Sequence, residues 1–142
     1  MADDMTPTQR SYTMSRIRSA GNQSTEKRFL RLLRLAGVTG WRRSARLPGR
    51  PDLVFRNQRL VVFLDGCFWH GCPRCYAPPK SNVRYWTQKI AGNVARDKRT
   101  SQTLTAAGWT VFRIWEHSIK TNPTRALNRL RSVLAQTRPA AD

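Results

Sequence analysis

The sequence predicts an α/β fold in which a mixed sheet is flanked by helices. Apolar residues recur at helical spacing in three stretches, which are 24–36, 81–107 and 123–134. Shorter apolar runs with the length of strands lie at 41–47, 53–55, 60–64 and 109–115. Because a strand, a long helix and another strand follow one another along the chain, the helices are expected to cover the sheet.

The first helix is expected between Ser24 and Gly37. Ser24 is suited to cap its N-terminus, and Glu26 lies in the first turn, where the helix dipole favours an acid. Its apolar face would consist of Phe29, Leu32, Leu33 and Ala36. Glycine is typical of a helix C-terminus, so we place the end of this helix at Gly37.

Two acidic residues frame the predicted hairpin formed by 53–55 and 60–64. The four residues between these strands make a connection of hairpin length. Asp52 stands at the start of the first strand and Asp65 at the end of the second. In an antiparallel pair these two ends meet, so we expect the two carboxylates to lie close together.

A long helix is expected from Ser81 to Ala107, after a loop that contains the cysteines. Its apolar side would consist of Val83, Trp86, Ile90, Val94 and Leu104. After the strand at 109–115, Asn122 and Pro123 have the residue types of a helix cap and a first helical position. The last helix would bury Ala126, Leu127, Leu130, Val133 and Leu134.

The charge balance indicates a nucleic-acid partner. The chain has 26 Lys and Arg residues against 8 Asp and Glu residues, which gives a formal net charge of +18. A basic surface of this kind binds a polyanion by displacing its counterions. A protein that binds polyanions through charge alone would have a similar composition, but it has little use for acids placed beside aromatic residues and cysteines.

The chain divides into a basic arm at 1–23, a folded domain at 24–136 and a loose tail at 137–142. No apolar run approaches the roughly 20 residues of a membrane span, and the N-terminus is polar. We therefore expect a soluble, cytoplasmic protein with no membrane partner. A reducing compartment disfavours disulfides among its three cysteines, which directs attention to metal binding.

The cysteine spacing predicts a zinc site. Cys67, Cys72 and Cys75 have the pattern C-x4-C-x2-C, which suits three corners of a zinc tetrahedron. A closed site needs a fourth ligand, and the chain has two histidines, His70 and His117. The pattern leaves both open. We favour His117, because a link between remote segments restrains the fold more and leaves His70 beside the acids.

The same window contains groups suited to phosphodiester hydrolysis. That reaction needs a divalent cation to offset charge on the phosphate and a base to activate water. Mg²⁺ prefers oxygen ligands, so Asp52 and Asp65 are candidate ligands. His70 is the candidate base, because imidazole titrates near neutral pH. Singly, each is as well explained as a turn-capping acid or a loop histidine; together, in so basic a chain, they favour catalysis.

Four segments resemble the very short patch repair (Vsr) family of DNA mismatch endonucleases. They are LPGRPDLVF, VVFLDGCFWHGCPRCY, NVRYWTQKIAGNVARDKR and GWTVFRIWEH, and the resemblance covers roughly residues 10–118. It implies a restriction-endonuclease-like fold with a structural zinc, so that 24–136 would be an endonuclease domain. The implied activity is a Mg²⁺-dependent nick 5′ to the thymine of a T:G mismatch, the lesion left by deamination of 5-methylcytosine.

The resemblance also implies partners and residue roles. The partner would be double-stranded DNA with a T:G mismatch, in a bacterial cytoplasm at the nucleoid, with accessory mismatch-repair proteins as further candidates. Because one active site that nicks one strand requires no dimer, we expect a monomer. The metal-binding aspartate falls on Asp52, the catalytic histidine on His70, and a carbonyl that contacts the metal on Leu64. Two further active-site acids fall on Glu26 and Asp97. The aromatic wedge that enters the base stack falls on Phe68, Trp69 and Trp86.

The chain departs from some relatives at three places. They have Thr-His where this chain has Leu64 and Asp65, so Asp65 could bind the metal directly or through water. His117 stands where relatives can carry cysteine, and the loop around Cys72 is one residue longer than in some members. Two alternatives stay open. One is a nuclease of the same fold with another lesion or site preference, and the other is a zinc-stabilised nucleic-acid-binding protein without catalysis.

Overall fold

The computed structural model describes residues 25–43, 46–77 and 79–137. The predicted arm at 1–23 and the cap Ser24 lie outside these residues, as do the last five residues of the predicted tail. Residues 25–35 are helical, and the elements after them are β1 Trp41–Arg42, β2 Leu53–Phe55, β3 Leu60–Asp65, α2 Val83–Ala106, β4 Thr110–Trp115, α3 Glu116–Thr121 and α4 Pro123–Gln136. Within the described residues, no helix has the length and apolar character needed to cross a membrane.

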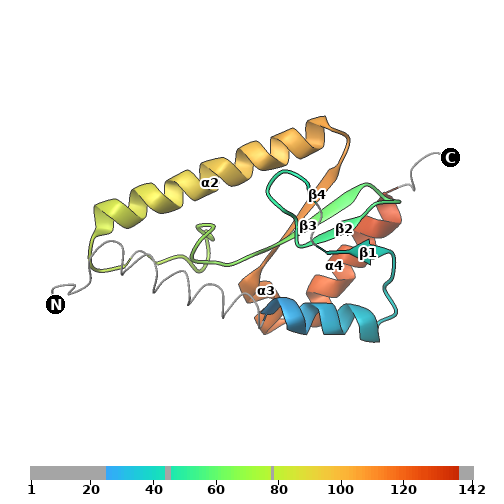
Figure 1. Cartoon of the computed structure of the whole chain (residues 1–142). Helices are drawn as coiled ribbons and strands as arrows, with labels where there is room; N and C mark the ends of the chain where they lie inside the picture. The colour runs from blue at the N-terminus through green and yellow to red at the C-terminus, as the bar shows by residue number, and fades with distance from the viewer. Residues whose placement is uncertain (1–24, 44–45, 78, 138–142) are drawn as a thin grey trace.

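In the described part of the chain, the strands form one four-stranded sheet in the order β1-β2-β3-β4. The pairs β1–β2 and β2–β3 are antiparallel, whereas β3 lies parallel to β4. A parallel neighbour requires a long crossover, and α2 supplies it here. The predicted α/β fold, a mixed sheet with flanking helices, is therefore confirmed (Figure 1).

Helices cover both faces of the sheet, with α2 on one side and α4 on the other (Figure 1). Alternate residues of a strand point to opposite faces of the sheet, and the residues on both faces are apolar here. The larger core joins the helix at 25–35, α3 and α4 to one set, which is Leu53, Phe55, Leu60, Val62, Phe112 and Ile114. On the other face, Val54, Val61 and Phe63 pack with Leu104 of α2.

Two helix ends follow the expected local chemistry. Gly37 ends the first helix with a φ of 74°, a conformation that glycine adopts at little cost. The side chain of Asn122 accepts a hydrogen bond from the backbone N–H of Arg125 at 3.1 Å, and Pro123 occupies the first turn of α4. The predicted start of the last helix is thereby confirmed.

Three expectations differ from the structure. β1 covers only Trp41–Arg42 instead of 41–47, because it pairs with the last two residues of the short strand β2, while 44–45 lie outside the described part. β3 continues one residue further than expected, so Asp65 is inside the strand. α3 was not predicted, because its six residues follow β4 directly and are too few to show a helical period.

The apolar side of α2 is only partly buried. Trp86, Ile90 and Leu104 are buried, but Val83 and Val94 are 50% and 44% exposed. The helix has 24 residues, a length of about 36 Å, whereas strands of six residues span about 20 Å. Much of α2 therefore extends past the sheet (Figure 1), where it meets the cysteine loop instead of the core.

Candidate active site

Asp52 lies directly before β2 and is held against the end of β3. Its backbone N–H donates to the carbonyl oxygen of Val62 at 3.0 Å. Its Oδ2 atom accepts a hydrogen bond from the backbone N–H of Leu64 at 2.6 Å. Burial raises the pKa of Asp52 to about 6, and the carboxylates of Glu26 and Asp65 act in the same direction. Because burial and the neighbouring carboxylates disfavour the ionised form of Asp52, a cation bound beside it would stabilise that form.

The carbonyl of Leu64 is directed toward the same side as the Asp52 carboxylate. In an antiparallel pair, the N–H and C=O groups of one residue face the same neighbouring strand, and those of every second residue do so too. The C=O of Val62 accepts from Asp52, so the N–H and C=O of Leu64 face that side as well. Carboxylate and carbonyl oxygens are the ligands that Mg²⁺ prefers, so the donor set fits this cation.

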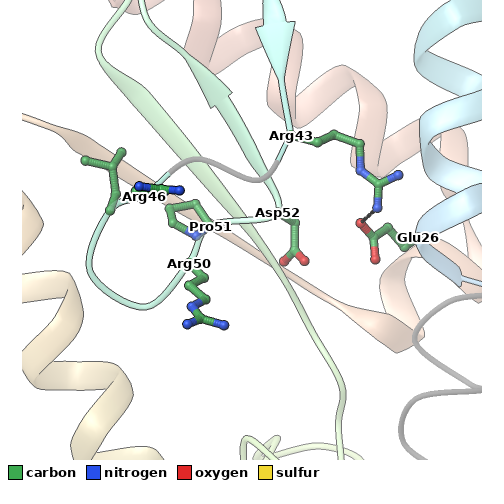
Figure 2. A pocket seen from close by; sticks show the side chains of 7 residues that line it. Glu26, Arg43, Arg46, Arg50, Pro51 and Asp52 are labelled. Atoms are coloured by element: carbon green, nitrogen blue, oxygen red, sulfur yellow. Dashed lines mark hydrogen bonds and ion pairs between the residues drawn. The ribbon is translucent and has the colours of Figure 1, made fainter.

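The Asp52 carboxylate borders a cavity of about 670 Å³. The cavity is lined by Glu26, Arg43, Arg46, Leu47, Arg50, Pro51 and Asp52. Figure 2 shows the carboxylates of Asp52 and Glu26 directed into the same space, with Glu26 paired to Arg43 at 2.5 Å. Because acids and arginines line it together, the cavity suits a cation and the phosphate that the cation would neutralise.

His70 lies in the loop after β3 and is held by α2. Its Nδ1–H donates to Oδ2 of Asp97 at 2.5 Å. Because a carboxylate accepts this bond, Nδ1 carries the proton and Nε2 is the nitrogen that can take one. One helical turn earlier, the side-chain amide of Asn93 donates to the carbonyl oxygen of Trp69 at 3.0 Å. Two residues of α2 thus fix the loop and its imidazole.

Asp65 is paired with Arg113 of β4. The Nη1 atom of Arg113 lies 3.0 and 3.1 Å from the two carboxylate oxygens of Asp65, whose side chain is only 5% exposed. The Nε2 atom of His70 lies 3.8 Å from Oδ1 of Asp65, which is longer than a hydrogen bond. Asp52 and Asp65 therefore stand at the same end of the hairpin but bind different partners.

A smaller cavity, of about 180 Å³, lies beside His70. It is lined by Gly49, Phe63, Trp69, His70, Asn93, Arg96, Asp97, Thr100 and Arg113. Gly49 has a φ of 75°, and a Cβ atom at this position would collide with the side chain of Thr100. The close packing of this loop on α2 brings the segment that precedes Asp52 next to the helix that carries Asp97.

Cys67, Cys72, Cys75 and His117 form a cluster in which the ligand atoms all lie within 4.8 Å of one another. Nδ1 of His117 lies 3.3 Å from Sγ of Cys67 and 3.5 Å from Sγ of Cys72. The corresponding edge of a zinc tetrahedron measures about 3.6 Å, so the donor set fits zinc. Burial raises the pKa of the Cys67 thiol to about 12, so a metal would be needed to keep it ionised. His70 is not part of this cluster.

The sheet explains how His117 reaches the cysteine loop. Asp65 and Trp115 are partners in the parallel register of β3 and β4. Both strands end at this edge of the sheet, so the residues two positions further on, Cys67 and His117, leave the sheet side by side. The link between these remote segments is thus set by strand pairing.

Phe68, Trp69 and Trp86 pack against one another. The ring centroids lie 5.3 Å apart for Phe68 and Trp69, 5.5 Å for Phe68 and Trp86, and 6.0 Å for the two tryptophans. Trp86 is 2% exposed and Trp69 is 9% exposed, whereas Phe68 is half-buried. The rings predicted to enter a base stack form a closed cluster here, and insertion would require this cluster to open.

Sequence reasoning missed two residues that shape this region, Arg113 and Asn93. Arg113 has a recognisable signal, because it is a charged residue inside the apolar run at 109–115 and lies on the same face of the sheet as Phe63. Asn93 has a weaker one, a polar residue on α2 one turn before Asp97. The arginines that line the larger cavity had no signal in so basic a chain.

Comparisons with known proteins bear on this site. The sequence profile of the family described as "DNA mismatch endonuclease Vsr" matches residues 2–76. The "Type II nicking enzyme V.XorIIP" of Xanthomonas oryzae pv. oryzae is 43% identical over 118 residues, which is 82% of this chain and 85% of that protein. The "DNA mismatch endonuclease Vsr" of Escherichia coli is 38% identical over 122 residues, 84% of this chain and 77% of that protein. The "Type II nicking enzyme V.NaeI" of Lentzea aerocolonigenes is 50% identical over 68 residues, 48% of this chain and 41% of that protein.

Proposed function

The chain belongs to the Vsr family of DNA mismatch endonucleases, and on that basis we propose that it nicks one strand of double-stranded DNA on the 5′ side of the thymine in a T:G mismatch. Such a mismatch arises when 5-methylcytosine deaminates, so the nick would begin very short patch repair. Two of the relatives are named nicking enzymes, which supports a cut in a single strand. The net charge of +18 supports a DNA substrate.

The pairing of His70 with Asp97 is the observation that carries the proposal. The short hydrogen bond to Nδ1 leaves Nε2 as the basic nitrogen, and it fixes the plane of the imidazole. The loop before Asp52 borders both cavities, since Arg50 lines the one beside Asp52 and Gly49 lines the one beside His70. In this arrangement His70 takes a proton from the attacking water at Nε2, and Asp97 holds the ring in that tautomer and stabilises the imidazolium that forms.

The proposed magnesium ligands are the Asp52 carboxylate and the Leu64 carbonyl oxygen. The sequence also predicts Asp65 in this role, but Arg113 engages both of its carboxylate oxygens. When bound there, Mg²⁺ would offset the negative charge on the scissile phosphate. Glu26 faces the same cavity, where its carboxylate is held by an arginine. Arg46 and Arg50 line this cavity too and would bind the phosphates beside the cut, because guanidinium groups match phosphate oxygens.

The proposed zinc ligands are Cys67, Cys72, Cys75 and His117. Four protein ligands close the coordination sphere and leave no position for water, so this metal would be structural. The loop that they anchor also carries His70, and zinc would therefore keep the base in place without taking part in the reaction.

Phe68, Trp69 and Trp86 are proposed to open their packed cluster and enter the base stack beside the mismatch. Unstacking costs a few kcal/mol for each base step, and it costs less where a mismatch already weakens the stack. Phe68 is the most exposed of the three rings and would lead the insertion. Selectivity for the lesion would then follow from the deformability of the DNA as well as from contacts with the bases.

A nicking assay tests the proposed function. Duplexes of one sequence would carry a T:G mismatch, another mismatch or a matched pair, with either strand labelled and with Mg²⁺ present. We expect one cut, in the thymine strand, on the 5′ side of the mismatched thymine. Equal cutting of another mismatch would favour the alternative of a related nuclease with a different lesion preference. Binding of DNA without any cut would favour a non-catalytic DNA-binding protein.

A further inference from the structure

Arg113 joins three parts of the molecule around His70, although the proposed reaction does not use it. Besides its contacts with Asp65, its Nη2 atom donates to the main-chain carbonyl oxygen of Asp97 at 3.2 Å. Its Nε atom donates to the side-chain hydroxyl of Ser101 at 3.1 Å. One planar guanidinium group therefore ties the end of β3 to two successive turns of α2, and the first of these turns carries the partner of His70.

The sheet register enforces this arrangement. Phe63 and Arg113 are partners in the parallel pair β3–β4, and Asp65 lies two residues beyond Phe63 on the same face. The guanidinium carbon of Arg113 lies 4.1 Å from the centroid of the Phe63 ring, a cation–π contact that helps to hold the guanidinium in place. The Asp65 carboxylate is almost fully buried, and a buried carboxylate requires a compensating positive charge. Arg113 supplies that charge.

We propose that Asp65 and Arg113 form a positioning pair that fixes Asp97, and through it His70, and that Asp65 is not a magnesium ligand. This inference rests on the proposed function. Both oxygens of Asp65 are engaged by Nη1, so a cation bound at Asp65 would lie beside a guanidinium of the same charge sign. The Asp52 carboxylate, in contrast, accepts from a backbone N–H, and among the described residues no arginine forms an ion pair with it, although three arginines line its cavity.

The experiment compares wild type, Asp65→Asn, Arg113→Met and the double variant. Single-turnover nicking would be measured over a range of Mg²⁺ concentrations, with DNA affinity measured separately without Mg²⁺. We expect each single variant to lose about 10–100-fold in the maximal rate, as is usual when a group that orients a functional side chain is removed. The Mg²⁺ concentration for half-maximal rate and the DNA affinity should change by less than about twofold. Arg113→Lys should recover only part of the rate, because an ammonium cannot reach Asp65, Asp97 and Ser101 together.

Coupling between the two residues supplies a second readout that does not depend on activity. Arg113→Met leaves a buried carboxylate without its partner, so its unfolding midpoint should fall more than that of Asp65→Asn/Arg113→Met. In the nicking assay, the double variant should be no slower than the slower single variant, because the pair acts as one unit. Arg59→Met is the matched control. Arg59 also lies over an aromatic ring, 5.9 Å from Trp109, but at the opposite end of β3.

A raised Mg²⁺ requirement for Asp65→Asn, with the full rate restored at high Mg²⁺, would overturn the inference and make Asp65 a metal ligand. Rate losses that multiply in the double variant would also overturn it. Failure of the wild-type protein to nick any mismatch would refute the proposed function instead. The unfolding comparison would then still decide whether Asp65 and Arg113 are coupled.

Discussion

The Nδ1 atom of His117 lies 3.3 Å from the Sγ atom of Cys67, although 50 residues separate them in the sequence. If a metal joins them, it links the ends of β3 and β4. We therefore expect His117→Ala to lose bound zinc and much of its thermal stability, because binding of a structural zinc is coupled to folding. His117→Cys should keep both, since thiolate and imidazole are equivalent zinc ligands. Metal analysis of the purified variants, together with their unfolding midpoints, measures this.

His70→Ala is the control for the zinc prediction. His70 lies in the same loop but is bonded to Asp97, so its removal should leave the zinc content at one ion per chain. Loss of zinc from this variant, with retention in His117→Ala, would reverse the assignment of the fourth ligand.

The same variant tests the base. Removal of a general base typically slows a reaction by about 10²–10⁴-fold, so His70→Ala should lower the single-turnover nicking rate by that amount while DNA binding persists. Asp97→Asn keeps a hydrogen-bond acceptor for Nδ1–H but loses the negative charge. Its nicking rate should therefore fall by less than that of His70→Ala. Thr103→Ala, six residues further along α2, is the matched control. A nearly unchanged rate in His70→Ala would show that another group activates the water.

Asp52→Asn should separate activity from stability. Burial raises the pKa of Asp52 from its usual value of 3.8 to about 6, so the folded protein favours the protonated form. Well below pH 3.8 the carboxyl is protonated in the folded and unfolded chains alike and has no effect, and at pH 4 its effect is still small. As pH rises from 4 to above 6, ionisation costs the folded state up to about 3 kcal/mol, since 1.36 kcal/mol corresponds to one pKa unit. Near pH 7.5 and without added Mg²⁺, the free energy of unfolding of Asp52→Asn should therefore exceed that of wild type.

Denaturant unfolding of both proteins at pH 4 and pH 7.5 measures this difference. The asparagine still accepts the hydrogen bond from Leu64, so the comparison isolates the charge. Added Mg²⁺ should stabilise wild type more than the variant, and the variant should not nick DNA. An Asp52→Asn protein that is less stable than wild type at pH 7.5 would show that the carboxylate already has a compensating partner.

Much of the fold could be predicted because each element has its own local signal. The hairpin, α2, β4 and the cap at Asn122 all depend on periodicity or on residues next to one another in the sequence. Asp52, Asp65 and His70 were found in the same way, since they cluster around one hairpin, whereas Glu26 and Asp97 came from the family resemblance alone. The pairing of Asp65 with Arg113 could not be predicted, because it depends on the parallel register of β3 and β4, which are separated by a 24-residue helix. The pairing of two strands that lie so far apart in the sequence cannot be predicted from the residues within each strand.

The choice between His70 and His117 as the predicted zinc ligand shows the same limit. Spacing within the cysteine loop favoured neither. The register that pairs Asp65 with Trp115 brings His117 to the cysteine loop. The imidazole of His70 is instead hydrogen-bonded to the Asp97 carboxylate. Both facts follow from tertiary structure, whereas the residue types that could bind zinc follow from the sequence.

The loop before Asp52 supplies a prediction about packing. Gly49 and Gly37 both have positive φ values, 75° and 74°, so alanine at either position should cost about 1–2 kcal/mol for the left-handed backbone. Only at Gly49 would the new Cβ atom collide with Thr100 and press on the Phe63 ring, whereas nothing lies within 4 Å at Gly37. Overpacking of this kind adds about 1–3 kcal/mol, and it should displace the segment that leads into Asp52.

Gly49→Ala should therefore lose more stability than Gly37→Ala and also lose nicking activity, while Gly37→Ala keeps its activity. Thr100→Ser removes the methyl group nearest to the new Cβ atom, so Gly49→Ala/Thr100→Ser should recover part of both the unfolding free energy and the rate. Because the ring of Phe63 also lies 3.2 Å from that Cβ position, recovery should be incomplete. Equal stability and equal rates in the two alanine variants would mean that the loop does not need its contact with α2 to position Asp52.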